Sequence, residues 1–76
     1  MQDAKDAGML ALTVNGESRS VPGPCTVQTL LEGLEVGASR VAVAINRDVV
    51  PRSTFRSREL TSGDRVEILE AVGGGA

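Results

Sequence analysis

One run of apolar residues in this chain has helical spacing, and the other apolar runs alternate with polar or small residues. The helical run places four residues at positions i, i+3, i+4 and i+7: Val27, Leu30, Leu31 and Leu34. These four share one face of a helix of about two and a half turns. Thr26 is suited to cap its N-terminus, and Gly37 is expected in the left-handed conformation that ends it. Because one helix covers only one face of a sheet, the chain is expected to form an α+β domain.

The alternating runs predict strands on both sides of this helix. Leu10, Leu12 and Val14 alternate with Ala and Thr residues, and Asn15-Gly16 follows as a strong hairpin signal, because both turn positions need positive φ. The predicted strands cover residues 9–14, 18–21, 41–45, 49–50 and 65–72. This order favours a mixed sheet of four to five strands, with the last strand beside the first and one helix packed on one face. That arrangement is the β-grasp (ubiquitin-like) fold.

The 76 residues suffice for one domain, in which three segments are distinguished. Residues 1–8 are small and polar and are predicted to be a disordered leader. Residues 9–72 carry the β-grasp pattern, with Phe55 and Leu60 as expected core anchors in an irregular polar stretch. Residues 73–76 are predicted to form a flexible glycine-rich tail.

The composition excludes several classes of function. The chain has no His and a single Cys, so a Ser-His-Asp triad, a Cys-His pair, a His-ligated metal site and an intramolecular disulfide are all absent. Its net charge of −2 and single aromatic residue argue against a nucleic-acid partner. No apolar run approaches the ~20 residues that span a bilayer, and a lone Cys fits the reducing cytoplasm. An enzyme in its own right is therefore the least favoured reading, and neither a metal nor a bound cofactor is expected.

The feature that best fits a function is the tail, Gly73-Gly74-Gly75-Ala76. Glycine has no Cβ, so such a tail is thin and adopts extended conformations that other residues avoid. From residue 71 onward the chain reaches roughly 20 Å when extended, at about 3.4 Å per residue. It can therefore enter a narrow channel in another protein and present a terminal carboxylate there. A carboxylate becomes a good electrophile only when one oxygen is made a good leaving group, as in an acyl-adenylate.

A second candidate is the sheet face near the tail. Leu69 points away from the core side chains of its strand and shares a face with Ala42 and Ala44; Val72 follows toward the tail. These four residues are the candidate docking surface for partners. Cys25 at the predicted helix N-terminus is interpreted as a small, partly buried structural residue. Arg47 and Arg52 are weak candidates for contact with an acidic partner.

The sequence resembles the ThiS family, the sulfur carriers of bacterial thiamine thiazole synthesis, from Met9 to Gly75. Six segments carry the similarity: residues 12–17, 26–31, 41–46, 49–52, 63–68 and 72–75. The most specific part is a combination of three motifs: Asn46-x-x-Val49-Val50-Pro51-Arg52, then Gly63-Asp64, then the glycine tail.

The resemblance implies a role as a protein co-substrate that catalyses nothing alone. An E1-like adenylyltransferase (ThiF type) would use ATP and Mg to adenylate the terminal glycine carboxylate. Sulfur, ultimately from cysteine by way of a cysteine desulfurase, would displace AMP and leave a thiocarboxylate. A thiazole synthase (ThiG type) would then take the sulfur, and the free carrier is expected to be a monomer.

Two features depart from the family pattern. Family members usually end on glycine, whereas Ala76 follows Gly75 here. We expect Ala76 to be removed, so that Gly75 becomes the thiocarboxylate acceptor. Family members also tend to begin at the first strand, which makes Met9 a candidate start.

Other functions stay open at this point. A molybdopterin-synthase small subunit shares the fold and the tail chemistry, although the Val-Val-Pro-Arg segment fits it less well. A ubiquitin-like modifier would be joined to lysines through its tail. A plain interaction module would carry an inert tail and would not depend on residues 73–76.

Overall fold

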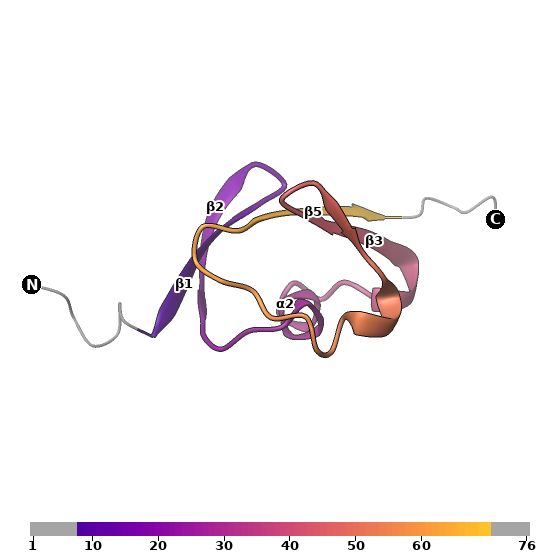
Figure 1. The fold of residues 1–76 in the computed structure, drawn as a ribbon, viewed down its shortest axis with the longest axis horizontal. Helices are drawn as coiled ribbons and strands as arrows, with labels where there is room; N and C mark the ends of the chain where they lie inside the picture. The colour runs from indigo at the N-terminus through magenta and orange to yellow at the C-terminus, as the bar shows by residue number, and fades with distance from the viewer. Residues whose placement is uncertain (1–7, 71–76) are drawn as a thin grey trace, which may run out of the picture.

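The computed structural model describes residues 8–70, which form a five-stranded mixed sheet with one helix on one face (Figure 1). The strands are β1 (Met9–Val14), β2 (Glu17–Pro22), β3 (Val41–Ile45), β4 (Asp48–Val50) and β5 (Arg65–Glu70), and the helix is α2 (Val27–Gly33). Two short 3-10 helices cover Ala38–Arg40 and Arg52–Thr54. No helix in residues 8–70 is long and apolar enough to cross a membrane.

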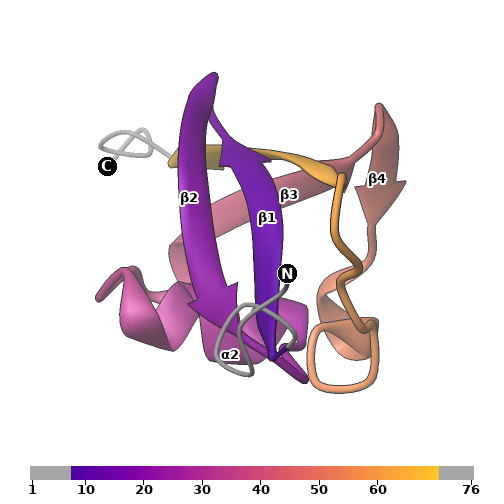
Figure 2. The same ribbon diagram turned by 90° about the vertical axis from the view of Figure 1, so that its left-hand side faces the viewer.

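The sheet has the order β2-β1-β5-β3-β4, so the last strand in the sequence is the middle strand of the sheet. β5 pairs in parallel with β1 and antiparallel with β3, and β2 and β4 form the two edges (Figure 2). The predicted β-grasp fold is confirmed, as is the placement of the last strand beside the first. The proposed leader and tail lie outside the described residues, apart from Gly8.

Two tight hairpin turns fix the register of the outer strands. Asn15 and Gly16 have φ of 50° and 85°, and the residues on either side of them are paired, which makes the predicted two-residue turn. The β3–β4 turn is built in the same way by Asn46 and Arg47, with φ of 51° and 74°. An arginine in the left-handed region is unfavourable by roughly 1–2 kcal/mol, so the pairing of the two strands compensates for it.

The helix begins as predicted but ends earlier. Thr26 is the N-cap, and its hydroxyl oxygen accepts a hydrogen bond from the Thr29 amide at 3.1 Å. The prediction that Gly37 ends the helix in the left-handed conformation is wrong: Gly37 has φ of −72°, and Glu35 has φ of 60°. The Val36 amide donates to the Leu31 carbonyl at 3.0 Å, which is the bond of a Schellman cap. Val36 packs on the core in this turn, so the chain must reverse before it reaches Gly37.

The core lies between the inner face of the sheet and α2. Its members are 14 buried residues, of which 13 come from the strands, the helix and the two predicted anchors. They are Leu12, Val14, Cys25, Val27, Leu30, Leu31, Val41, Val43, Ile45, Val50, Phe55, Leu60, Val66 and Ile68. The predicted anchors Phe55 and Leu60 are confirmed, with exposed fractions of 2% and 4%. Fully burying one such aliphatic or aromatic side chain contributes about 1.5–3 kcal/mol, so this cluster supplies most of the driving force for folding.

Two asparagine side chains hold β5 in place in addition to the strand ladders. The Asn15 Oδ1 accepts a hydrogen bond from the Ile68 amide at 2.8 Å, and its Nδ2 donates to the Ile68 carbonyl at 3.2 Å. At the start of the strand, Asn46 Oδ1 accepts from the Arg65 amide at 3.0 Å, and Asn46 Nδ2 donates to the Asp64 carboxylate at 3.1 Å. The strand that leads to the tail is thus fixed at its first residue and near its end.

We predict that Glu35→Gly stabilises the protein. Glycine adopts the left-handed conformation without the Cβ strain of glutamate, and part of that gain is lost to the larger entropy of the unfolded chain. The free energy of unfolding, measured in urea, should rise by about 0.5–1 kcal/mol. A loss of stability would contradict the assignment of Glu35 as the left-handed cap residue.

We predict that Asn15→Gly loosens β5 while keeping the turn. Glycine retains the positive φ at this position but lacks the amide that pairs with Ile68. Loss of two partly buried hydrogen bonds should lower the free energy of unfolding by about 1–2 kcal/mol. Hydrogen exchange of the Ile68 amide should accelerate more than that of the Val43 amide in the neighbouring strand. Equal exchange in the variant and the parent would show that Asn15 does not hold the strand.

Candidate functional site at the end of the last strand

The candidate site starts where β5 ends at Glu70. The predicted acceptor Gly75, its neighbours Gly73, Gly74 and Ala76, and the docking residue Val72 all lie outside the described residues. The described part of the site is therefore the base from which the tail departs.

The outer face of the sheet carries an apolar strip at this base. Leu69 is 71% exposed and lies directly opposite Ala42 in the β3–β5 ladder. Ala44 lies two residues further along β3 and is paired with Val49 of β4, which is 77% exposed. The structure thus places the predicted residues Leu69, Ala42 and Ala44 together on one face, and we call these residues with Val49 the docking face. Val49 was missed in the sequence, although its alternation with the buried Val50 indicates an outward side chain.

Leu69, whose side chain is largely exposed, borders two hollows. One has a volume of about 480 Å³ and is bordered by the β1–β2 hairpin, by Leu34 and Val36 after the helix, and by the end of β5. The other has a volume of about 340 Å³ and lies toward Arg40 and Arg52. A partner that fits this base would therefore need a recess for Leu69 and protrusions that enter the two hollows.

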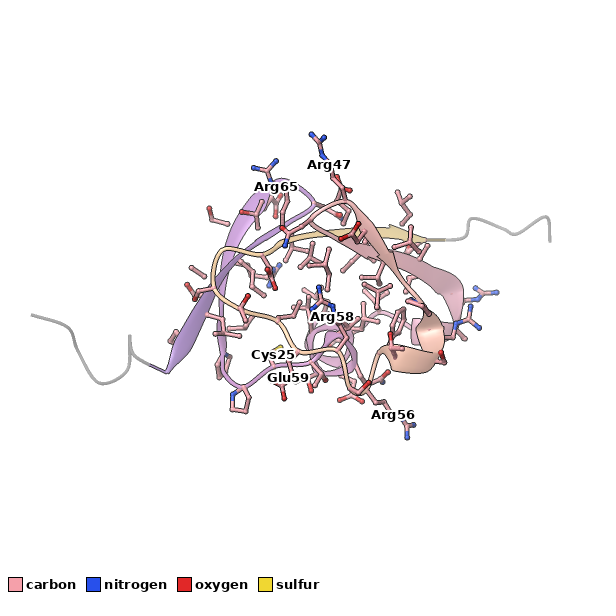
Figure 3. The ribbon with its side chains drawn as sticks, viewed as in Figure 1. Cys25, Arg47, Arg56, Arg58, Glu59 and Arg65 are labelled. Carbon is pink, nitrogen blue, oxygen red and sulfur yellow. The ribbon has the colours of Figure 1, made fainter. Side chains whose placement is uncertain are left out.

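The structure separates the two arginines that were considered together in the sequence. Arg47 lies in the β3–β4 turn, near Arg65 and on the outer side of the sheet (Figure 3). Arg52 instead lies at the hollow beside Leu69, where its Nη2 donates to the Ser39 carbonyl at 3.2 Å. Arg40 borders the same hollow. Arg40 and Arg52, rather than Arg47 and Arg52, are the cations beside the tail base, and Glu70 is the carboxylate that borders this hollow with them.

Cys25 has the properties of a structural residue. Its side chain is 2% exposed and its Sγ donates a weak hydrogen bond to the Thr26 carbonyl at 3.5 Å. Burial raises the pKa of the Cys25 thiol above its ordinary value, the opposite of what a nucleophile requires. Within residues 8–70, no group of three or more His, Cys, Asp and Glu side chains is arranged to hold a metal ion.

We predict that Cys25 makes stability fall at alkaline pH. The raised pKa means that the unfolded thiol loses its proton before the folded one does, so folding is favoured below about pH 8.5 and weakened above it. Urea unfolding between neutral pH and about pH 10 should show this loss in the parent chain. Cys25→Ala should be less stable at neutral pH and show a smaller loss with pH. An identical pH dependence in both proteins would rule out Cys25 as its source.

Comparison with known proteins finds a matching family model and several related proteins. The ThiS family model matches residues 12–75. The thiazole synthase of Paramagnetospirillum magneticum is 37% identical over 67 residues, which are 88% of this chain and 21% of that protein. This chain therefore spans about a fifth of that relative. The sulfur carrier protein ThiS of Escherichia coli is 27% identical over 66 residues, covering 87% of this chain and all of that protein.

A solved structure agrees with the fold and with the family. The crystal structure of the thiamine biosynthesis protein ThiS from Geobacter metallireducens superimposes with a TM-score of 0.73 and 38% sequence identity. The superposition covers 80% of this chain and 93% of that one. Taken with the family match over 64 of the 76 residues (12–75), these likenesses show that the chain belongs to the ThiS family, with the ubiquitin-like β-grasp fold.

Proposed function

We propose that this chain is a sulfur carrier that delivers sulfur for the thiazole ring of thiamine as a C-terminal thiocarboxylate. The observation that carries the proposal is the family match through Gly75, in a chain whose middle strand, β5, ends three residues before Gly73 in the sequence. The sulfur carrier name of the Escherichia coli relative supports the same reading. In this role the chain is a co-substrate on which partner enzymes act.

The chemistry requires an activated terminal carboxylate. A carboxylate oxygen attacks the α-phosphorus of ATP, held with Mg by an adenylyltransferase of the ThiF type, and pyrophosphate leaves. The outer sulfur of a protein persulfide, formed from cysteine by a desulfurase, then attacks the acyl carbon, and the C–S bond forms as the C–O bond to AMP breaks. A thiolate of a partner protein then attacks the inner sulfur of the resulting acyl disulfide, so that the S–S bond breaks, the thiocarboxylate leaves and a disulfide remains on the partner side.

Gly75 is the proposed acceptor, after removal of Ala76. The match to the family ends at Gly75, and a terminal glycine offers the slimmest carboxylate to an enclosed active site. Gly73 and Gly74 supply the rest of the slender approach. Purified adenylyltransferase should catalyse ATP–pyrophosphate exchange with the chain ending at Gly75 and far less with the chain ending at Ala76. Equal exchange with both chains would place the acceptor on the alanine and overturn the trimming step.

The final sulfur acceptor is proposed to be a thiazole synthase of the ThiG type. The relative from Paramagnetospirillum magneticum bears that name and is matched by this chain over about a fifth of its length. A second thiazole synthase, from Magnetococcus marinus, is 33% identical over 66 residues and is matched over 20% of its length. These matches place a segment like this chain in the same polypeptide as a thiazole synthase, which supports their working together.

Leu69 of the docking face is the proposed main contact with the adenylyltransferase. Because its side chain is 71% exposed, Leu69→Glu should change the free energy of unfolding by no more than about 0.5 kcal/mol. A charge buried at the centre of the interface should lower kcat/KM for pyrophosphate exchange by at least tenfold, since truncating a central contact alone often costs 2 kcal/mol or more.

Ser57→Glu is the matched control for Leu69→Glu. Ser57 is exposed in the loop that follows the short Arg52–Thr54 helix, and it borders neither hollow beside Leu69. It adds the same charge away from the tail base and should leave kcat/KM within twofold of the parent. Similar losses in both variants would indicate a general effect of charge and would remove the docking face from the proposal.

A further inference from the structure

An apolar groove runs between β2 and α2, on the helix side of the sheet and away from the docking face. Its volume is about 370 Å³. Its walls are formed on one side by Arg19, Val21 and Pro22 of β2, and on the other by Leu30 and Leu34 of the helix region. Val21 and Leu34 are only partly buried, so the groove exposes carbon surface that the chain itself does not cover.

The groove lies beside a strand edge with free backbone groups. β2 pairs with β1 and is the first strand of the sheet order, so its other edge has no neighbouring strand in residues 8–70 (Figure 2). The two-residue turn makes Val14 and Glu17 a hydrogen-bonded pair, and the alternation then directs the backbone of Arg19 and Val21 toward β1. The N–H and C=O groups of Ser18 and Ser20 therefore point outward. Another extended chain can replace water on such a row of groups and pair with it through backbone hydrogen bonds.

A helical glycine keeps the groove open. Gly33 is the last residue of α2 and borders the groove, and a Cβ added to it would meet no atom within 4 Å. Its φ is not positive, so neither packing nor backbone conformation in this chain requires glycine there. Glycine weakens a helix relative to almost any other residue. The space that its missing side chain leaves belongs to the groove.

We propose that the β2 edge and this groove bind an extended segment of a partner protein by strand addition. The segment pairs its backbone with Ser18 and Ser20. Its side chain opposite Val21 is aliphatic and enters the groove, and its side chain opposite Arg19 is acidic, because Arg19 and Val21 both border the groove. The groove shares Arg19 and Leu34 with one hollow beside Leu69 but leaves the docking face on the outer side of the sheet free, so the partner can hold the chain while the tail enters an active site.

A second copy of the chain fits this edge less well. Antiparallel pairing of two β2 strands that uses both Ser18 and Ser20 places Arg19 of one copy directly opposite Arg19 of the other. Like charges in such a pair are destabilising. The charge at Arg19 therefore favours an acidic partner segment over self-association.

The test uses the full chain and a capped seven-residue peptide in which one aspartate and two valines alternate with threonines. Amide chemical shifts should change in β2 and α2, and the Ser18 and Ser20 amides should become protected from hydrogen exchange. A peptide with lysine in place of the aspartate should bind at least fivefold more weakly. Absence of binding at millimolar peptide, or shift changes centred on the docking face, would overturn the proposal.

Gly33→Leu separates binding from folding. Leucine favours the helix, so the melting temperature should rise by about 3–6 °C. Its side chain fills the groove, so peptide affinity should fall at least tenfold. Gly37→Leu is the matched control: Gly37 also has open space around it but does not border the groove, and affinity should remain within twofold. Unchanged affinity in Gly33→Leu would overturn the proposal.

Two further measurements decide between occupants. If removal of residues 1–7 shifts the β2 and α2 amides in the absence of peptide, the leader occupies the groove and the proposal is wrong. If sedimentation shows a dimer in which Ser18 and Ser20 become protected as concentration rises, a second copy is the occupant and the proposal is equally wrong. A monomer whose β2 and α2 amides are unaffected by leader removal is the expected result.

Discussion

The structure depends on the insertion of β5 between β1 and β3. This strand comes last in the sequence, yet it is the middle strand of the sheet, and Val66 within it is fully buried. Two ladders and two asparagine side chains fix it: Asn46 binds the backbone of Arg65, and Asn15 binds the backbone of Ile68. Without β5, the β1–β2 and β3–β4 hairpins share no hydrogen-bonded strand. β5, which precedes the glycine tail in the sequence, is thus the strand that joins the two hairpins into one sheet.

This arrangement separates the rigid part of the chain from the proposed reactive part. The helix and the inner sheet face bury the apolar side chains, including the lone thiol of Cys25. The outer face instead presents short side chains such as those of Ala42, Ala44 and Thr13. The larger, exposed side chain of Leu69 lies on the same face near the end of β5. A carrier of this size has little interior to spare for a catalytic cavity. The proposed activity therefore depends on a surface and a terminus, and partner enzymes supply the catalytic groups.

Local patterns in the sequence predicted much of this architecture. The Asn15-Gly16 turn, the Thr26 cap and the alternation of β3 all depend on neighbouring residues, and all three are confirmed. The early end of the helix was not predicted, because it depends on Val36 reaching the core rather than on the position of a glycine. The Asn15–Ile68 pairing joins residues 53 positions apart, and no local pattern shows such a contact.

One part of the candidate site was likewise predicted from the sequence, and another part was not. The strand period placed Leu69, Ala42 and Ala44 on one face, because side-chain direction in a strand is a local property. The approach of Arg52 to Ser39, and the groove between β2 and α2, arise from the packing of separate elements and required the structure. The proposed role as a sulfur carrier is best tested by the intact mass of the chain ending at Gly75 after incubation with adenylyltransferase, ATP, Mg and a sulfur source. We expect one oxygen to be exchanged for one sulfur on the C-terminal fragment. An unchanged mass, with enzymes shown to be active on another ThiS-family carrier, would contradict it.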